Sequence, residues 1–261
     1  MGKLDGKYIR GLVGDTVFKK VGKKQVVQGK SKKKIKQTVA TKKAAGVFGK
    51  ASNMASDIRV ALAQTIGEHD GMAISRFTGE NALVLNSALI RETQTFDFSN
   101  AAFDKLNGFE FNIDSPVRKF LFAQPAVTTT EEAINVTLPE MHIPRDLKFP
   151  TEGKNCILAF QAALFDLENY RRLKQDAQSV EIKYEYKPLT IPTTEFNFTS
   201  EPGCLCVITV TLRYFVKTFA GNLGINSKSF NPAAILKAFM IPGTVNPDAT
   251  KSWREMSFNV K

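Results

Sequence analysis

The stretch "CLCVITVTLRYFVK", residues 204–217, decides the class of fold, because β-branched and aromatic residues in this density favour a β-strand. A strand places Cys204 and Cys206 on one face, two positions apart, where a disulfide between them is geometrically poor. With Cys156 they make a sparse set of three cysteines. We interpret all three as reduced thiols that pack as small apolar residues.

Further strand-like segments surround this stretch, and connectors that contain proline lie between them rather than inside them. In "VEIKYEYK", residues 180–187, apolar or aromatic residues alternate with charged ones, which predicts one buried and one solvated face. Residues 155–176 fit either a strand or a helix, and we favour a strand over 156–168. Regularly spaced strands with Pro and Gly turns predict an antiparallel β-sandwich. The other predicted strands are "FEFNI" (109–113), "AINVTL" (133–138) and "AAILKAFMI" (233–241).

Two helices are predicted before most of these strands. Between residues 38 and 67, small and apolar residues recur at steps of four and three, which is typical of one stripe of an amphipathic helix. Thr38 or Thr41 is a candidate N-cap, and Gly67 stands where a glycine ends a helix. A second, shorter helix is predicted over 79–94. The packing stripe consists of Ala44, Phe48, Ala51, Ala55, Ile58, Leu62 and Ile66.

A β-hairpin is predicted near the N-terminus. The runs "TVFKKV" (16–21) and "QVVQG" (25–29) are apolar and β-branched, and "GKK" between them contains the glycine that a short turn requires. Such a small sheet is not stable alone, so it must dock on its own chain or on a neighbouring copy. The candidate docking residues are Val17, Phe18, Val26 and Val27.

The net charge of +11 comes from one end of the chain. Residues 1–50 hold fifteen Lys or Arg and two Asp, a balance of +13, whereas residues 51–261 hold twenty-one basic and twenty-three acidic groups, a balance of −2. This asymmetry indicates contact with a polyanion or an acidic partner, and a solvated lysine-rich face is the alternative. The candidate contact residues are Lys19, Lys20, Lys23, Lys24, Lys30, Lys32, Lys33, Lys34 and Lys36.

The basic segment "GKKQVVQGKSKKKIKQ", residues 22–37, contains a Gly-Lys-Ser tripeptide at 29–31 but is not a phosphate-binding loop of the Walker type. That loop has four residues between its first glycine and Gly-Lys-Ser/Thr, and here six follow Gly22. The sequence has no Gly-x-Ser-x-Gly or His-Glu-x-x-His motif. Its two histidines, His69 and His142, are isolated in predicted loops, so neither a metal site nor a histidine-based catalytic site is indicated. We therefore expect no enzyme activity, no cofactor and no small-molecule substrate.

Several segments resemble a family of uncharacterised proteins of Bacteroidetes. These are "RGLVGDTVFKKVGKKQVVQGK" (10–30) and "KQTVATKKAAGVFGKASNMASDIRVAL" (36–62), with its Lys-Gln-Thr and Phe-Gly-x-Ala-Ser motifs. More loosely, "INVTLPEMHIPRDLKFP" (134–150) and "VITVTLRYFVKTFAGNLGI" (207–225) are similar to the β-rich half of that family. The resemblance implies glycine-punctuated N-terminal strands, a small helical part and a β-sandwich. It implies no catalytic residues.

Taken together, these patterns predict an α+β fold, with an N-terminal β-hairpin and one or two helices beside a C-terminal antiparallel β-sandwich. The expected domains are a basic arm over 1–37, a helical segment over 38–95 and a β-sandwich domain over 96–261. No apolar run approaches the ~20 residues of a membrane helix, and the N-terminus lacks the apolar region of a secretory signal. We therefore expect a protein without a membrane span, in the cytoplasm or exported without a cleaved signal.

The expected function is that of a non-enzymatic structural protein that assembles with copies of itself into a filament, tube or shell-like oligomer. The N-terminal hairpin and the lysine-rich arm would make the contacts between subunits. The alternative is sequence-independent nucleic-acid binding by the same lysines. Arg10 is the one arginine of the basic segment, and Tyr8 and Phe18 are its aromatic residues, which argues against base readout and base stacking.

Overall fold

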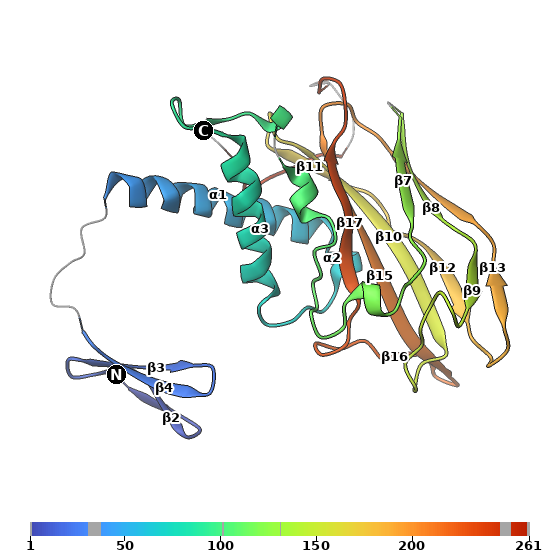
Figure 1. The fold of residues 1–261 in the computed structure, drawn as a ribbon, viewed down its shortest axis with the longest axis horizontal. Helices are drawn as coiled ribbons and strands as arrows, with labels where there is room; N and C mark the ends of the chain where they lie inside the picture. The colour runs from blue at the N-terminus through green and yellow to red at the C-terminus, as the bar shows by residue number, and fades with distance from the viewer. Residues whose placement is uncertain (1, 31–37, 101, 131, 246–251, 260–261) are drawn as a thin grey trace. The chain divides into compact units, whose positions relative to one another are not determined.

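The computed structural model describes residues 2–30, 38–100, 102–130, 132–245 and 252–259. The chain divides into two compact units, an N-terminal unit (Met1–Ala44) and a C-terminal unit (Ala45–Lys261) (Figure 1). The helices are α1 (Val39–Ala61), α2 (Ala63–Ile66) and α3 (Ala73–Ala88), with 3-10 turns η1 (Phe98–Asn100), η2 (Phe103–Leu106) and η3 (Val117–Lys119). The strands are β1 (Lys3–Asp5), β2 (Tyr8–Val13), β3 (Thr16–Val21), β4 (Lys24–Gly29), β5 (Leu89–Ile90), β6 (Thr95–Phe96), β7 (Ala126–Thr129), β8 (Ala133–Leu138), β9 (Met141–Ile143), β10 (Asn155–Asp166), β11 (Arg171–Lys174), β12 (Gln178–Lys183), β13 (Leu189–Ile191), β14 (Thr194–Thr199), β15 (Leu205–Thr218), β16 (Gly221–Gly224), β17 (Ala233–Met240) and β18 (Arg254–Glu255).

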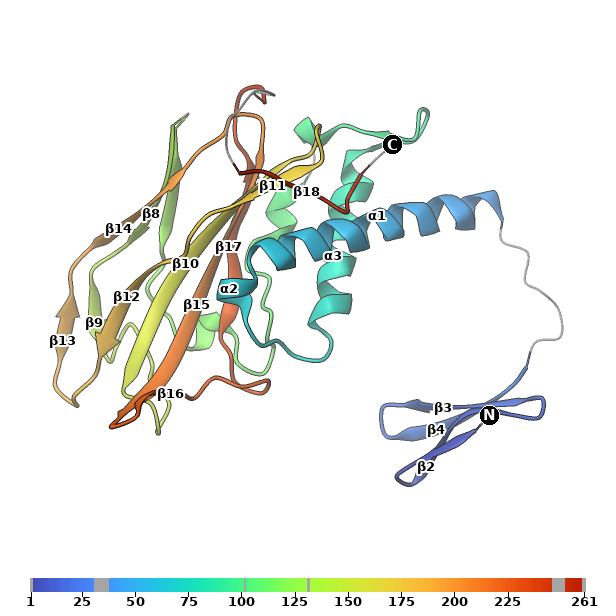
Figure 2. The ribbon, with the colours of Figure 1, turned by 180° about the vertical axis from the view of Figure 1, so that it is seen from behind.

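Two long antiparallel strands, β10 and β15, form the centre of the C-terminal unit. Their pairing runs from Asn155 opposite Phe215 to Phe165 opposite Leu205. The far edge of β10 pairs with β12 and β11, and the far edge of β15 pairs with β17 and β16. With β18 beside β11, the result is one seven-stranded sheet (Figure 2).

One face of this sheet packs against a second sheet of order β14-β8-β7. Leu158 and Phe160 of β10 share a core with Val136 of β8 and Phe196 of β14, and the Phe160 and Phe196 rings lie 4.9 Å apart. The mixed class with helices and antiparallel strands is confirmed. The finer prediction of a β-sandwich is not confirmed, because the sheet curls into a half barrel instead of remaining a flat layer (Figure 2).

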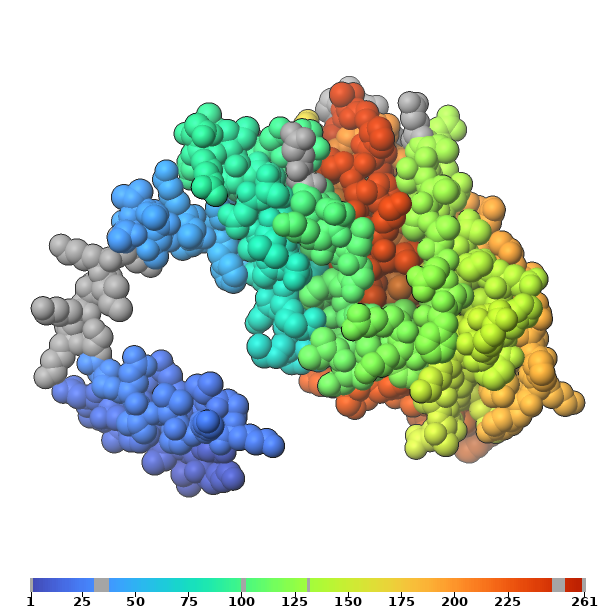
Figure 3. Space-filling view, viewed as in Figure 1, coloured from blue at the N-terminus to red at the C-terminus, as the bar shows by residue number. Residues whose placement is uncertain are grey.

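The helices cover the opposite face of the large sheet (Figure 1). Phe77 of α3 and Ile58 of α1 share a core with Phe165 and Val207 of the central strands. The helical segment and the strands therefore share one core, and the expected boundary at residue 95 does not separate compact units. In the space-filling view, β17 is visible as a red band between the helical part and β7–β8 (Figure 3).

Four of the five central residues of the predicted helix stripe, Ala51, Ala55, Ile58 and Leu62, are fully buried. Phe48 is 55% exposed and does not belong to the buried face. The physical reason is that α1 extends past the core, since residues 38–46 are all exposed and contact with the core begins at Val47. A pattern of three- and four-residue steps cannot show where along a helix the covering layer ends.

The predicted helix boundaries are partly confirmed. The Thr38 hydroxyl accepts a hydrogen bond from the Thr41 amide at 3.1 Å, which caps the start of α1, and Gly67, with φ +56°, follows the end of α2. The second helix is Ala73–Ala88 and not 79–94, so it begins and ends about two turns earlier than predicted. Residues 156–168 are largely strand, as favoured, whereas 109–113 contributes a single bridge at Glu110.

A network of polar side chains holds α2 on the large sheet. The Thr65 hydroxyl lies 2.9 Å from Gln161 Oε1 and 2.7 Å from the Thr209 hydroxyl. Arg213 donates to the Thr65 carbonyl at 3.3 Å, and Asn231 donates to the Ile66 carbonyl at 2.7 Å. Buried polar groups are stable only when they are hydrogen-bonded, and these groups satisfy one another across segments far apart in sequence.

Asp70 ties the loop after α2 to α3 and to the segment at Ile113. Its carboxylate accepts hydrogen bonds from the Met72 amide at 2.7 Å, the Ile113 amide at 3.1 Å and the Arg76 guanidinium at 2.5 Å. Burial alone would raise the pKa of Asp70, but the hydrogen bonds from Ile113, Met72 and Arg76 outweigh it and lower that pKa below its ordinary value.

We predict that Asp70 makes the stability of the C-terminal unit sensitive to acid. Because its folded pKa is lowered, ionised Asp70 stabilises the fold above pH ~4, and this contribution is lost as the pH falls through the folded pKa. The free energy of unfolding of Asp70→Asn is expected to be about 1–3 kcal/mol lower than that of the parent at neutral pH. On acidification, the free energy of unfolding of the variant should fall by less than that of the parent. Denaturant unfolding across a pH series measures both effects. The exposed Asp114→Asn is the matched control, and equal acid sensitivity of Asp70→Asn and the parent would contradict the prediction.

Candidate functional site

Three two-residue turns join the strands of the N-terminal unit. Gly6-Lys7, Gly14-Asp15 and Gly22-Lys23 connect β1 to β2, β2 to β3 and β3 to β4. Each of these glycines has φ +59°, which glycine adopts without strain and which the first position of a type II′ hairpin turn requires. Since the glycines recur every eight residues, strand and turn lengths repeat, and the four strands form a continuous antiparallel sheet.

The backbone pairing of β2 with β3 stops at Gly11, and the Gln25 side chain holds the remaining part of β2 in the sheet. Gln25 Oε1 accepts a hydrogen bond from the Ile9 amide at 2.9 Å, and Gln25 Nε2 donates to the Ile9 carbonyl at 2.9 Å and to the Lys19 carbonyl at 3.0 Å. The Tyr8 hydroxyl donates to the Lys23 carbonyl at 2.6 Å. These bonds make one sheet of segments that the sequence analysis treated as a hairpin with a lead-in.

The N-terminal unit has no core of its own, because no side chain of residues 2–30 is buried. Of the predicted docking residues, Val17 and Phe18 are half-buried, while Val26 is 38% and Val27 is 59% exposed. Phe18 lies directly opposite Val27 and shares a face with it, whereas Val17 and Val26 lie on the other face. Apolar side chains thus emerge on both faces of the sheet.

The predicted lysine contacts gather on one hairpin. Lys19 and Lys20 of β3, Lys23 of the turn and Lys24 of β4 are exposed, and exposed Lys30 follows β4 directly. Lys32, Lys33, Lys34 and Lys36 lie outside the described residues. The described lysines share the β3–β4 hairpin with the predicted docking residues, so charge and apolar surface are interleaved.

Strand β4 forms one edge of the sheet, since within residues 2–30 its backbone pairs with β3 alone. The hairpin closes with Val21 opposite Lys24, and hydrogen-bonded and non-hydrogen-bonded pairs then alternate along the ladder. Phe18 opposite Val27 is a non-hydrogen-bonded pair. The N–H and C=O groups of Val27 therefore point away from β3 towards the free edge.

The described part of the C-terminal unit holds three buried cysteines. Burial raises the pKa of the Cys204 thiol to about 12 and raises the pKa values of Cys156 and Cys206 further, which disfavours the thiolate form of all three. No cluster of three potential metal ligands occurs within the described ranges. His142 Nε2 lies 3.4 Å from Glu140 at an exposed site.

No described helix combines the length and apolarity that crossing a membrane requires.

Comparison with protein-family models, with curated proteins and with solved structures gives no match to this chain. The geometry of the N-terminal sheet is therefore the evidence for the candidate functional site. The sequence analysis missed β1, the extension of the hairpin to four strands and the role of Gln25. The recurrence of Gly-Xaa at positions 6, 14 and 22 is the sequence signal that identifies the additional turns.

We predict that Gln25→Ala loosens the part of β2 around Ile9, which has no backbone pairing with β3. The Ile9 amide loses its acceptor in this variant, so its hydrogen exchange should accelerate by about tenfold, as expected for one lost hydrogen bond of about 1 kcal/mol or more. Amide exchange measured by NMR on the full chain tests this. Gln28→Ala is the matched control, because Gln28 accepts a hydrogen bond from the Lys19 side chain and is directed to solvent. Unchanged exchange at Ile9 would disprove the role of Gln25.

Proposed function

We propose that this protein is a non-enzymatic structural protein that assembles with copies of itself, and that the N-terminal unit makes the contacts between subunits. The observation that carries the proposal is a four-stranded sheet without a buried side chain, whose edge strand β4 pairs only with β3 among the described residues. A sheet of this kind acquires an apolar layer and backbone partners through association.

The energetics of the sheet favour a partner. Ordering each residue costs about 1–2 kcal/mol of backbone entropy, and burial of apolar side chains is the main compensation in a folded unit. Leu4, Val13, Val21 and Val27 are all more than half exposed, so this compensation is missing within the unit. Full burial of each such side chain contributes about 1.5–3 kcal/mol. Covering the sheet would therefore supply the stabilisation that small sheets require.

A second copy of β4 fits the unpaired edge. In an antiparallel pair, a residue whose N–H group points to the partner strand lies opposite another such residue. This rule allows a register in which Val26 lies opposite Val26 of the second copy, with the two copies related by a two-fold axis. In this register Gln25 lies opposite Val27, and Lys24 lies opposite Gln28. Shifting the register by one step on each strand, to Val27 opposite Val27, would place Lys24 opposite Lys30 and cost repulsion. The apolar centre and separated lysines of β4 thus favour the register with Val26 opposite Val26 over the register with Val27 opposite Val27.

The alternative function, sequence-independent nucleic-acid binding, is supported by the same hairpin. Lys19, Lys20, Lys23, Lys24 and Lys30 are exposed and could neutralise phosphates. Lysines alone do not account for a sheet with apolar side chains on both faces. Salt-sensitive retention of the full chain on DNA or RNA, without self-association, would favour this alternative.

We predict that Val27→Pro abolishes self-association. Proline removes the outward N–H of Val27 while leaving the β3–β4 hydrogen bonds in place, and proline is tolerated at sheet edges. The full chain should form oligomers at high concentration in sedimentation and light scattering, and the variant should remain a monomer. Val27→Thr, which keeps the N–H group and a β-branched side chain, should assemble as the parent does. A monomeric parent at high concentration would refute the proposal.

A cysteine placed at Val26 tests the register. The Cα atoms of a non-hydrogen-bonded antiparallel pair lie about 4.5 Å apart, within the range of a disulfide. Val26→Cys should form a disulfide-linked dimer under mild oxidation, seen on a non-reducing gel. Val27→Cys should not, since it faces Gln25 of the second copy and its own counterpart lies on the diagonal, about 7–8 Å away. Equal cross-linking of both variants would contradict this register.

A further inference from the structure

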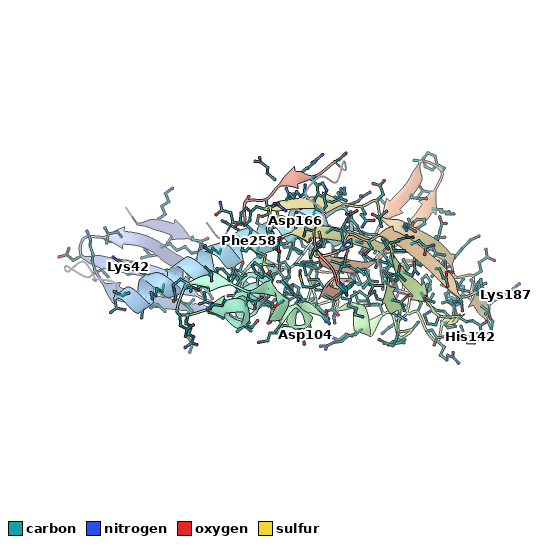
Figure 4. The ribbon with its side chains drawn as sticks, turned by 90° about the horizontal axis from the view of Figure 1, so that it is seen from above. Lys42, Asp104, His142, Asp166, Lys187 and Phe258 are labelled. Atoms are coloured by element: carbon teal, nitrogen blue, oxygen red, sulfur yellow. The ribbon has the colours of Figure 1, made fainter. Side chains whose placement is uncertain are left out.

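A cleft of about 650 Å³ lies in the C-terminal unit at the start of β10, between the end of β12 and the far part of β15. Residues of the loop before β10, of β10 itself, of the segment after β12 and of β15 line it. Lys187, which directly follows the lining residue Tyr186, lies at the end of this unit away from Phe258 (Figure 4). The cleft is therefore far along the sheet from the helix-covered core, and its volume suits a small ligand.

Asn155 supplies a buried polar group without a protein partner. Its side chain is 6% exposed and lines the cleft, and its Nδ2 donates a hydrogen bond to the Phe215 carbonyl at 3.3 Å. Asn155 Oδ1 has no hydrogen-bond partner among the described residues. A buried acceptor that stays unsatisfied costs about 1–3 kcal/mol. Oδ1 is itself covered by protein, so a ligand hydroxyl or N–H would satisfy it after the Asn155 side chain turns towards the cleft.

Tyr186 supplies an aromatic surface held in an unusual conformation. Its φ is +60°, a left-handed backbone conformation that residues other than glycine rarely adopt, and such conformations concentrate at functional sites. The Tyr186 ring lies 5.3 Å from the Tyr184 ring and 4.3 Å from Lys154 Nζ, yet its side chain remains 66% exposed. Tyr184 in turn stacks on Phe149 at 5.5 Å. Tyr184 and Lys154 thus hold the Tyr186 ring in place, and much of that ring remains exposed to solvent.

The charges around the cleft are largely paired. Lys183 forms an ion pair with Glu185, and Lys217 forms one with Glu181 at 2.7 Å. The cleft therefore presents hydrogen-bonding groups of both signs without a strong net field, which disfavours a phosphate or another small anion as its ligand.

We propose that this cleft binds a neutral saccharide. A sugar ring has an apolar C–H face that packs on an aromatic side chain such as Tyr186, and its hydroxyls both donate and accept hydrogen bonds. One hydroxyl donates to Asn155 Oδ1, and others bond to Lys183, Glu185 and Lys217. The proposal concerns the C-terminal unit and is independent of assembly through the N-terminal sheet.

The test is binding of the labelled full chain to a printed array of neutral and acidic glycans, followed by titration of the best neutral oligosaccharide. Tyr186→Asn should weaken binding by at least about tenfold, because the stacking surface is lost. Asparagine tolerates the left-handed backbone, and the site is exposed, so this variant should fold. Tyr186→Phe keeps the ring and should bind within about twofold of the parent.

Asn155→Leu removes the unsatisfied acceptor and should also weaken binding, while its thermal unfolding shows that the sheet is retained. Neutral glycan binding that Tyr186→Asn and Asn155→Leu lose, and Tyr186→Phe keeps, supports the proposal. Retention of no glycan overturns it. So does binding confined to acidic glycans that high salt abolishes, or neutral binding that Tyr186→Asn leaves unchanged.

Discussion

The pairing of β10 with β15 is the interaction on which the C-terminal unit depends. It joins Asn155–Phe165 to Leu205–Phe215 without a break, and every other strand of the large sheet except β18, which pairs with β11, attaches to one of these two. The two faces of this pair carry different cores, one covered by α1 and α3 and the other by β8 and β14. A shift of one residue would exchange these two faces, so both cores depend on one register.

A polar network adds specificity to this frame. Thr65, Gln161 and Thr209 form hydrogen bonds with one another beneath α2. Arg213 and Asn231 donate hydrogen bonds to the carbonyl groups at the end of that helix. Burial lowers the pKa of Arg213, which lies against the backbone at Gly67. Apolar packing alone would allow α2 to slide on the sheet, whereas these directional bonds define one position.

The two units differ in what stabilises them. The C-terminal unit buries phenylalanines, leucines and valines on both sides of its central strands, while the N-terminal unit buries no described side chain. Its glycine turns and the Gln25 bonds specify strand order and register, yet they contribute no hydrophobic burial. The N-terminal sheet is therefore specified locally, and in the proposed function it is completed by association.

The sequence by itself determined the strand character of residues 204–217, the helix face at Ala51, Ala55 and Ile58, the buried thiols and the basic N-terminal hairpin. These features depend on local periodicity and composition, which neighbouring residues carry. Only the tertiary structure decided that Phe48 is exposed, that the sheet curls, and that Asn155 and Tyr186 line one cleft. Those features depend on contacts between segments far apart in the chain, and a periodic pattern does not record which partner covers it or where that partner ends.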